Sequence, residues 1–319
     1  MEDGPAEAIL PASLKASSSP TYHMSEDQIG LLAPDKLLTM LPLTLGFAIP
    51  FLAGLGIDIW LLARIPTIRA TLAARAPALR HTPWSWREAF LLALLALLLN
   101  LLASFAVLSI ERLTGSDAAS LSMTLLIQTA WVPLCILALV RAMLLRHGTT
   151  WTAAFGLAPR RFAREMGRAI LLLLALFPPL VLTAIVAQFV LTRLHIPVER
   201  QFVVNILTDP NQPVWLRAYL CVAATLVAPV VEEIAFRGIL LPALARSGRW
   251  VLAAGVVAML FAAAHFNLVS LLPLFVLAFG LSLAYMESGS LWLPILMHSL
   301  FNAASLAALL LATHYLEVP

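Results

Sequence analysis

Charged residues are scarce in this chain. Of its 319 residues, 12% are Asp, Glu, Lys or Arg and 61% are hydrophobic, whereas a soluble domain carries about 25% charged residues. This scarcity excludes an ordinary soluble protein. The formal net charge is +3, but the arginines lie between hydrophobic runs and form no basic stripe of the kind that binds nucleic acid. The composition predicts an integral membrane protein whose partners include the lipid bilayer and no nucleic acid.

Cysteine and the common ligand-binding motifs are also scarce or absent. The two cysteines, Cys135 and Cys221, lie inside apolar runs, which excludes a disulfide framework and a cysteine-rich metal centre. No GxGxxG, Walker or EF-hand pattern occurs, so nucleotide and calcium sites of those kinds are excluded as well. The chemistry must therefore be sought inside the hydrophobic runs.

Long hydrophobic runs are the main feature that the chain does have. A membrane-spanning helix needs about 20 mostly apolar residues, and runs of this kind follow one another along most of the sequence. We predict an all-α fold, a polytopic membrane helix bundle of about eight transmembrane helices. The predicted helices cover residues 37–63, 89–110, 121–145, 169–192, 214–244, 250–266, 269–287 and 291–315.

Residues 1–35 differ in composition from the rest of the chain. They hold six acidic residues and no apolar run long enough for a signal sequence, so we predict a disordered extracytoplasmic tail, followed by a transmembrane domain over residues 36–319. Arginines cluster in alternate loops, and the positive-inside rule then places both termini outside the cytoplasm. The Arg-rich, Ala/Leu-rich composition favours a bacterial inner (cytoplasmic) membrane. The loop arginines are Arg64, Arg69, Arg75, Arg80, Arg87, Arg146, Arg160, Arg161, Arg164, Arg168, Arg246 and Arg249.

One basic segment, residues 151–168, has two interpretations. It combines Trp and Phe with several arginines. An amphipathic arm on the inner membrane surface has this composition, and so does an ordinary basic loop.

Three charged side chains lie inside the fifth hydrophobic run. Glu232, Glu233 and Arg237 fall within six consecutive positions, and a charge at the bilayer centre costs from about 2.5 to more than 10 kcal/mol, so such groups face a cavity or a partner. Glu233 precedes Arg237 by four residues, the favourable order for a helical ion pair. Glu232 points about 100° away around the helix, which makes it the better candidate for a base that takes a proton from water. Pro229, just before the glutamates, is predicted to distort the helix.

Two later runs carry polar residues at the same spacing of four. His265 follows Phe261, and Asn302 follows His298 on the last run. If the three helices meet, the site holds a base, a group that orients water, and two hydrogen-bond donors for a developing oxyanion. Peptide-bond hydrolysis by activated water needs these parts. Each part alone also has a structural explanation: a buried ion pair, a packing histidine, or a hydrogen bond between helices.

The three motifs, in this order, resemble those of a known family. This is the CPBP family, which comprises the type II CAAX prenyl endopeptidases and their bacterial Abi, or bacteriocin-processing, relatives. The resemblance covers roughly residues 214–305, which we interpret as a CPBP-like catalytic core, and the first four runs carry no matching motif. The motif positions are Glu232, Glu233, Arg237, Phe261, His265, His298 and Asn302.

The resemblance implies an intramembrane endopeptidase that acts on a membrane-associated peptide or protein substrate. It also implies roles for the motif residues. These roles are water activation by Glu232 and His265, support of the site by Glu233 and Arg237, and an oxyanion hole formed by His298 and Asn302.

The need for a metal is a separate question, because the family is commonly named as metalloproteases. Glu232, His265 and His298 could hold zinc or another divalent metal, with water in the fourth position. A glutamate base with no cofactor is the preferred interpretation, since Asn302 beside His298 suits an oxyanion hole better than a ligand shell.

Other classes of membrane protease lack their signatures here. The chain has no HExxH and no GxGD, and Gly280-Leu281-Ser282 lacks the glycine expected after a rhomboid serine. Two rival functions stay open: a transporter or channel that uses the buried charges as a proton relay, and a noncatalytic bacteriocin-immunity or scaffold protein. The sequence also leaves open the substrate, its prenylation and the oligomeric state.

Overall fold

The structure is a computed structural model that describes residues 34–75, 82–114, 124–196 and 202–316. The tail predicted for residues 1–35 lies outside this part of the chain, except for its last two positions. Met1–Pro42 and Leu43–Pro319 form two separate units. Every side chain discussed below belongs to the second unit.

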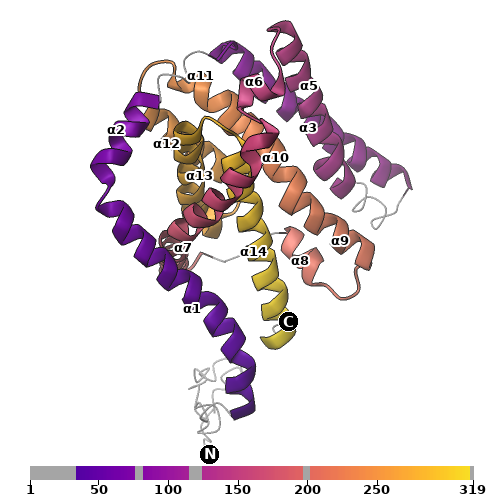
Figure 1. The fold of residues 1–319 in the computed structure, drawn as a ribbon. Coiled ribbons are helices and arrows are strands. Elements are labelled where there is room, and N and C mark those ends of the chain that lie inside the picture. Colours follow the sequence, from indigo (N-terminus) through magenta and orange to yellow (C-terminus); the bar gives the residue numbers. More distant parts are fainter. Residues whose placement is uncertain (1–33, 76–81, 115–123, 197–201, 317–319) are drawn as a thin grey trace, which may run out of the picture. The chain divides into compact units, whose positions relative to one another are not determined.

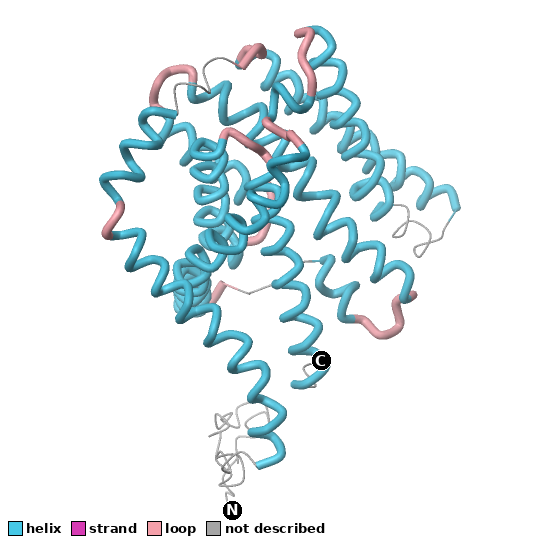
Figure 2. Tube along the Cα trace, viewed as in Figure 1, coloured by secondary structure: helices cyan, strands magenta, loops and turns pink. Residues whose placement is uncertain are grey.

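Helices make up nearly all of the described residues, and Figure 2 shows them joined by turns with no strand in that part of the chain. Figure 1 labels most of them. In chain order they are α1 (Pro34–Leu62), α2 (Ile65–Arg75), α3 (Trp86–Thr114), η4 (Ile127–Trp131), α5 (Val132–Arg146), α6 (Trp151–Phe155), η5 (Pro159–Arg161), α7 (Phe162–Arg193), α8 (Phe202–Thr208), α9 (Val214–Val222), η6 (Ala223–Val227), α10 (Ala228–Glu233), η7 (Ile234–Leu240), α11 (Leu241–Ala245), α12 (Trp250–Ala263), α13 (Leu268–Ser288) and α14 (Trp292–Leu316).

The predicted all-α, multi-pass membrane bundle is confirmed. Within the described residues, seven helical segments are long and apolar enough to cross a membrane, and α12 is a further apolar helix of 14 residues. The chain is therefore an integral membrane protein. The segment 151–168 is not an ordinary loop, because apart from residues 156–158 it consists of α6, η5 and the first turns of α7; its place on the membrane surface stays a prediction.

Helix α12 ends earlier than the predicted 250–266 because the next helix begins with a cap of its own. The Asn267 side chain accepts a hydrogen bond from the backbone N–H of Ser270, 2.9 Å away, which starts α13. Phe266 has a φ of 49°, a left-handed conformation that cannot continue a helix. His265 thus lies in the turn after α12 rather than within the helix.

Three π-helical segments, η4, η6 and η7, each end two residues before a proline. Proline has no N–H, and its ring clashes with the carbonyl four residues earlier, so the preceding turn widens from the α to the π pattern. Segments η6 and η7 flank α10, which carries both glutamates. The distortion predicted at Pro229 is present before the glutamates as η6, and a second distortion, η7 before Pro242, follows them. The pairs of segment end and proline are Trp131 with Pro133, Val227 with Pro229, and Leu240 with Pro242.

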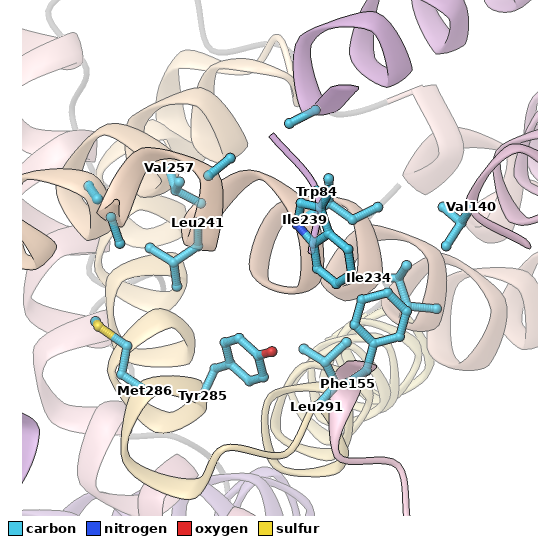
Figure 3. Close-up of a cluster of buried hydrophobic side chains, with 14 of the residues drawn as sticks. Trp84, Val140, Phe155, Ile234, Ile239, Leu241, Val257, Tyr285, Met286 and Leu291 are labelled. Carbon is cyan, nitrogen blue, oxygen red and sulfur yellow. The ribbon is translucent and has the colours of Figure 1, made fainter. Parts of the chain in front are cut away.

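A buried hydrophobic cluster holds η7 against the segments around it. Figure 3 shows Trp84, Phe155 and Ile234 among its members, and the rings of Trp84 and Phe155 lie 5.5 Å apart between centroids. Gly238 lies so close to this cluster that a Cβ there would come within 2.9 Å of the Phe155 ring. Arg246, just beyond α11, donates hydrogen bonds to the carbonyls of Thr82 and Trp84. These contacts fix the C-terminal end of the glutamate-bearing segment.

The elements that carry the three motifs are neighbours in space. Helix α13 packs against α7, α12 and α14, and α10 packs against α14. A second buried cluster joins Phe261 of α12, Ala278 of α13 and Met297 of α14. The convergence of the three motif-bearing helices, on which the sequence interpretation depended, is present in the fold.

Candidate active site

Glu233 lies at the centre of the polar cluster. Its side chain is fully buried, and its Oε1 accepts hydrogen bonds from Nη1 of Arg237 at 2.8 Å and from Nδ1 of His298 at 2.9 Å. The pairing of Glu233 with Arg237, predicted from their spacing of four, is confirmed. A buried carboxylate is stable only when such partners compensate its charge.

Arg237 is also fully buried and has contacts on two further sides. Its Nη2 donates to the carbonyl oxygen of Ala278 at 2.9 Å. Its guanidinium carbon lies 4.6 Å from the ring centroid of Phe261, in cation–π geometry. The Phe261 ring in turn contacts His265, at 4.8 Å, and His298, at 5.5 Å between centroids. Phe261 is therefore the apolar centre around which the charged and imidazole groups are arranged.

Glu232 differs from Glu233 in exposure and in the pairing of its carboxylate. Its side chain is 31% exposed, and its Oε2 lies 3.9 Å from Nε2 of His298, which is too long for a direct hydrogen bond. No described residue donates a hydrogen bond to Oε2 of Glu232. Glu232 was predicted to face away from Arg237 and to meet both His265 and His298. Among the described residues it forms no ion pair with Arg237 and approaches His298, but no hydrogen bond or ion pair joins it to His265. Glu232 therefore keeps an unpaired carboxylate oxygen beside an imidazole.

The two imidazoles share one tautomer. The partner of Nδ1 is a carboxylate oxygen in His298, and in His265 it is the carbonyl oxygen of Phe261, 2.8 Å away. Because both of these oxygens only accept hydrogen bonds, Nδ1 carries the proton in each neutral ring and Nε2 is left as an acceptor. A neutral His298 therefore has no N–H left on the side of Glu232.

His265 and Asn302 lie at the edge of the cluster. Among the described residues His265 forms neither a hydrogen bond nor an ion pair with Glu232, and its ring contacts the ring of Phe261. Nδ2 of Asn302 donates to the carbonyl of Ala224, 2.8 Å away in the π-helical segment η6. A carboxamide nitrogen has two N–H groups, so Asn302 has a second one to offer. The structure thus brings Glu232, Glu233, Arg237 and His298 together and leaves His265 and Asn302 beside them.

The metal alternative was predicted to use Glu232, His265 and His298. The tautomers suit ligation, since a metal-bound histidine commonly donates its other N–H to a carboxylate or carbonyl. The positions do not, because no group of three or more His, Cys, Asp or Glu side chains among the described residues could hold a metal ion. The preferred interpretation, a glutamate base with no cofactor, and its alternative, a divalent metal, both stay predictions.

Comparison with known protein families bears directly on this cluster. The model of the family described as Rce1-like, type II CAAX prenyl endopeptidase, matches residues 213–304. This range contains every motif position, which confirms the resemblance read from the motifs. No curated protein and no solved structure matches the chain. The Rce1-like segment supports a role as a protease of the CAAX type in general terms.

Some residues of the site were not foreseen from the sequence. The carbonyl of Ala278 accepts from both Arg237 and the hydroxyl of Ser282, although Ala278 carries no polar side chain that could mark it. The hydrogen bond from Asn302 to the carbonyl of Ala224 could not be predicted from the sequence either. Its only signal was Pro229, since the widened backbone before a proline frees carbonyl groups from their usual helical partners.

Proposed function

We propose that the chain is an intramembrane endopeptidase that hydrolyses peptide bonds of a membrane-associated peptide or protein, with Glu232 as the general base. One observation carries the proposal. Within a cluster where Glu233, Arg237 and His298 are paired, Glu232 alone receives no hydrogen bond and lies 3.9 Å from an acceptor nitrogen of His298. Polar atoms at this separation suit a bridging water molecule. A carboxylate and an imidazole nitrogen that contact the same water molecule can activate it, since the carboxylate accepts a proton and the nitrogen accepts a hydrogen bond.

The proposed reaction begins when Glu232 takes one proton from the water while Nε2 of His298 accepts a hydrogen bond from the other. The water oxygen then bonds to the peptide carbonyl carbon, and the electron pair of the C=O double bond moves to the carbonyl oxygen. The second N–H of Asn302 stabilises this oxyanion. As the C=O bond re-forms, the C–N bond breaks and Glu232 gives its proton to the departing nitrogen. The products are a carboxyl group and an amine, and Glu232 is again a carboxylate.

Glu233 and Arg237 act as positioning residues in this scheme. Glu233 holds the imidazole of His298 through Nδ1, so that in the neutral ring Nδ1 carries the proton and Nε2 is the acceptor. Arg237 fixes the Glu233 carboxylate and is itself fixed by the carbonyl of Ala278. His265, whose Nε2 is also an acceptor in the neutral ring, lies against the Phe261 ring and is proposed to orient the substrate or the water.

The membrane orientation is also a proposal. We place the arginine-rich ends of the helices in the cytoplasm of a bacterial inner membrane and both termini outside it, following the positive-inside rule. Arg246 and Arg249 lie at the end of the glutamate-bearing segment. The site would then be reached from the cytoplasmic half of the bilayer.

Purified protein reconstituted in liposomes and incubated with a library of synthetic peptides tests this function. Half of the library carries a C-terminal prenylcysteine and half does not, so the two halves also report whether a prenyl group is needed. We expect new peptide termini, detected by mass spectrometry. A protein that produces none, yet moves ions or solutes across the liposome membrane, is a transporter and not a protease.

Treatment of the same protein with a chelator tests whether the reaction needs a metal. We expect cleavage to survive prolonged treatment with 1,10-phenanthroline and repurification in metal-free buffer. Loss of cleavage that zinc alone restores would instead assign the reaction to a metal held by Glu232, His265 and His298.

A further inference from the structure

A second polar site lies away from the Glu232 cluster. It is a cavity of about 1060 Å³ at the C-terminal end of α13, lined by residues of α2, α6, α7 and the segments around them. Four arginines line it, Arg75, Arg161, Arg164 and Arg168, and Glu287 is the single acid among the lining residues. None of these residues takes part in the proposed reaction.

The arginines outnumber the carboxylates that can neutralise them. Glu165, fully buried beside the cavity, pairs with Arg164 at 2.6 Å and with Arg168 at 2.9 Å. Glu287 pairs with Arg75 and with Arg168. Two carboxylates thus serve three arginines.

Arg161 forms no ion pair within the described residues and is half-buried at the wall of the cavity. With Arg161 the four cavity arginines exceed the two carboxylates by two positive charges, which no other acid of the described residues balances there. A cavity with this surplus attracts an anion.

The depth of the cavity in the membrane indicates what kind of anion reaches it. Ser288 and Glu287 end the membrane-spanning segment of α13, and the apolar part of α7 begins after Arg168. Helix α7 has 32 residues, about 48 Å at 1.5 Å per residue, whereas the hydrocarbon core is about 30 Å thick. The helix is therefore longer than the hydrocarbon core, and its arginine-bearing first turns are the part that suits the headgroup region. An edge-to-face pair of Phe162 and Trp292, 5.1 Å apart, accompanies them, as aromatic residues do at membrane interfaces.

We propose that this cavity binds a phosphate group, held by the guanidinium groups of Arg161, Arg164 and Arg168. Planar guanidinium groups form paired hydrogen bonds with phosphate oxygens, which makes arginine the usual residue for such recognition. The headgroup of an anionic phospholipid reaches this depth directly, and a free phosphate compound enters from the aqueous side along the exposed Arg164. Both sources present the same chemistry to the arginines.

Native mass spectrometry of the full-length protein tests the proposal and separates the two sources. Protein in neutral detergent is titrated with phosphatidylglycerol, with phosphatidylcholine, and with inorganic phosphate. Removal of one arginine charge near the membrane surface weakens binding of an anionic lipid about fivefold, so Arg161→Ala should raise the dissociation constant for phosphatidylglycerol by about that factor. Arg161→Lys, which keeps the charge, should recover most of the binding.

Arg160 supplies a matched control, because it is exposed and does not line the cavity although it is the preceding residue. Arg160→Ala should change the dissociation constant less than twofold. Since Arg161 has no ion pair to lose, both variants should fold, and a thermal unfolding scan of each verifies this. Preferential binding of phosphatidylglycerol identifies a lipid headgroup, and saturable binding of inorganic phosphate that depends on Arg161 identifies a soluble source; either upholds the site. Equal effects of Arg160→Ala and Arg161→Ala, or no binding of either phosphate probe, overturn it.

Discussion

Two charged clusters of this protein differ in burial and in charge balance. The interior cluster of Glu233, Arg237 and His298 is almost fully buried, and each member is bound by another. The boundary cluster of Arg75, Arg164, Arg168 and the two glutamates also forms a network, but its arginine side chains reach 53% exposure at Arg75 and 62% at Arg164. The interior cluster is buried and pairs one acid with one arginine. The boundary cluster is partly exposed and carries an excess of positive charge.

The difference follows from the solvent available to each cluster. In the membrane interior an unpaired charge costs several kcal/mol, so a buried acid and base must appear together. At the headgroup level, water and lipid phosphates can satisfy an arginine that has no partner in the chain. In each cluster the residue that breaks the local pattern, Glu232 inside and Arg161 at the boundary, is the one to which we assign a function.

Removal of one interior partner should have the largest effect on stability. Arg237→Ala leaves the Glu233 carboxylate buried with only His298 as a partner, and breaking a buried pair in this way costs about 3 to 5 kcal/mol. Reversible unfolding in mixed detergent micelles measures the loss.

The double variant Glu233→Gln with Arg237→Met is the control for this prediction. It removes both charges at nearly constant volume, so it should be clearly more stable than Arg237→Ala alone. Equal stability of wild type and Arg237→Ala would show that the buried pair of Glu233 and Arg237 does not stabilise the fold.

Neutralisation of the buried acid in the boundary cluster should have an intermediate effect. Glu165→Gln weakens three charge-assisted hydrogen bonds, two from Arg164 and one from Arg168, and such bonds contribute about 1.5 to 3 kcal/mol each at most. The arginines that it releases can turn to solvent, so we expect a total loss of about 1 to 3 kcal/mol in the same unfolding assay. A loss of stability as large as that of Arg237→Ala would mean that the two clusters depend equally on charge pairing.

The exposed end of the boundary network should matter least. Arg75 pairs with Glu287 at 3.2 Å while half of its side chain is exposed, and exposed ion pairs contribute about 0.2 to 1 kcal/mol. Arg75→Ala should therefore cost less than about 1 kcal/mol, and the cost should shrink further in 1 M salt. An effect that is independent of salt would point to packing of the arginine stem rather than to its charge.

Much of the fold could be predicted from the sequence because hydrophobic length and local spacing are local properties. The multi-pass helical bundle followed from the runs, and the pair of Glu233 with Arg237 followed from a spacing of four in a helix. The end of α12 could also have been predicted, since Asn267 three residues before Ser270 is a helix-start signal.

The remaining features depend on contacts between distant parts of the chain. Arg237 bonds the carbonyl of Ala278, and Arg168 bonds Glu287, 119 positions away. Neither partner stands out in the sequence, because a backbone carbonyl has no sequence signature and a single glutamate at a helix end looks solvated. The position of His265 against the Phe261 ring could not be predicted either, because it depends on how α12 ends and α13 begins.

The role of Glu232 is the central claim, and a time course of peptide cleavage by Glu232→Gln in liposomes tests it most directly. The control is Glu88→Gln, which alters another glutamate that pairs with a histidine, His147 at 2.7 Å, outside the Rce1-like segment. General base catalysis contributes about 10²- to 10⁴-fold, so Glu232→Gln should slow the appearance of new peptide termini by at least about a hundredfold, while Glu88→Gln stays near the wild-type rate. Cleavage by Glu232→Gln at the wild-type rate would contradict the account.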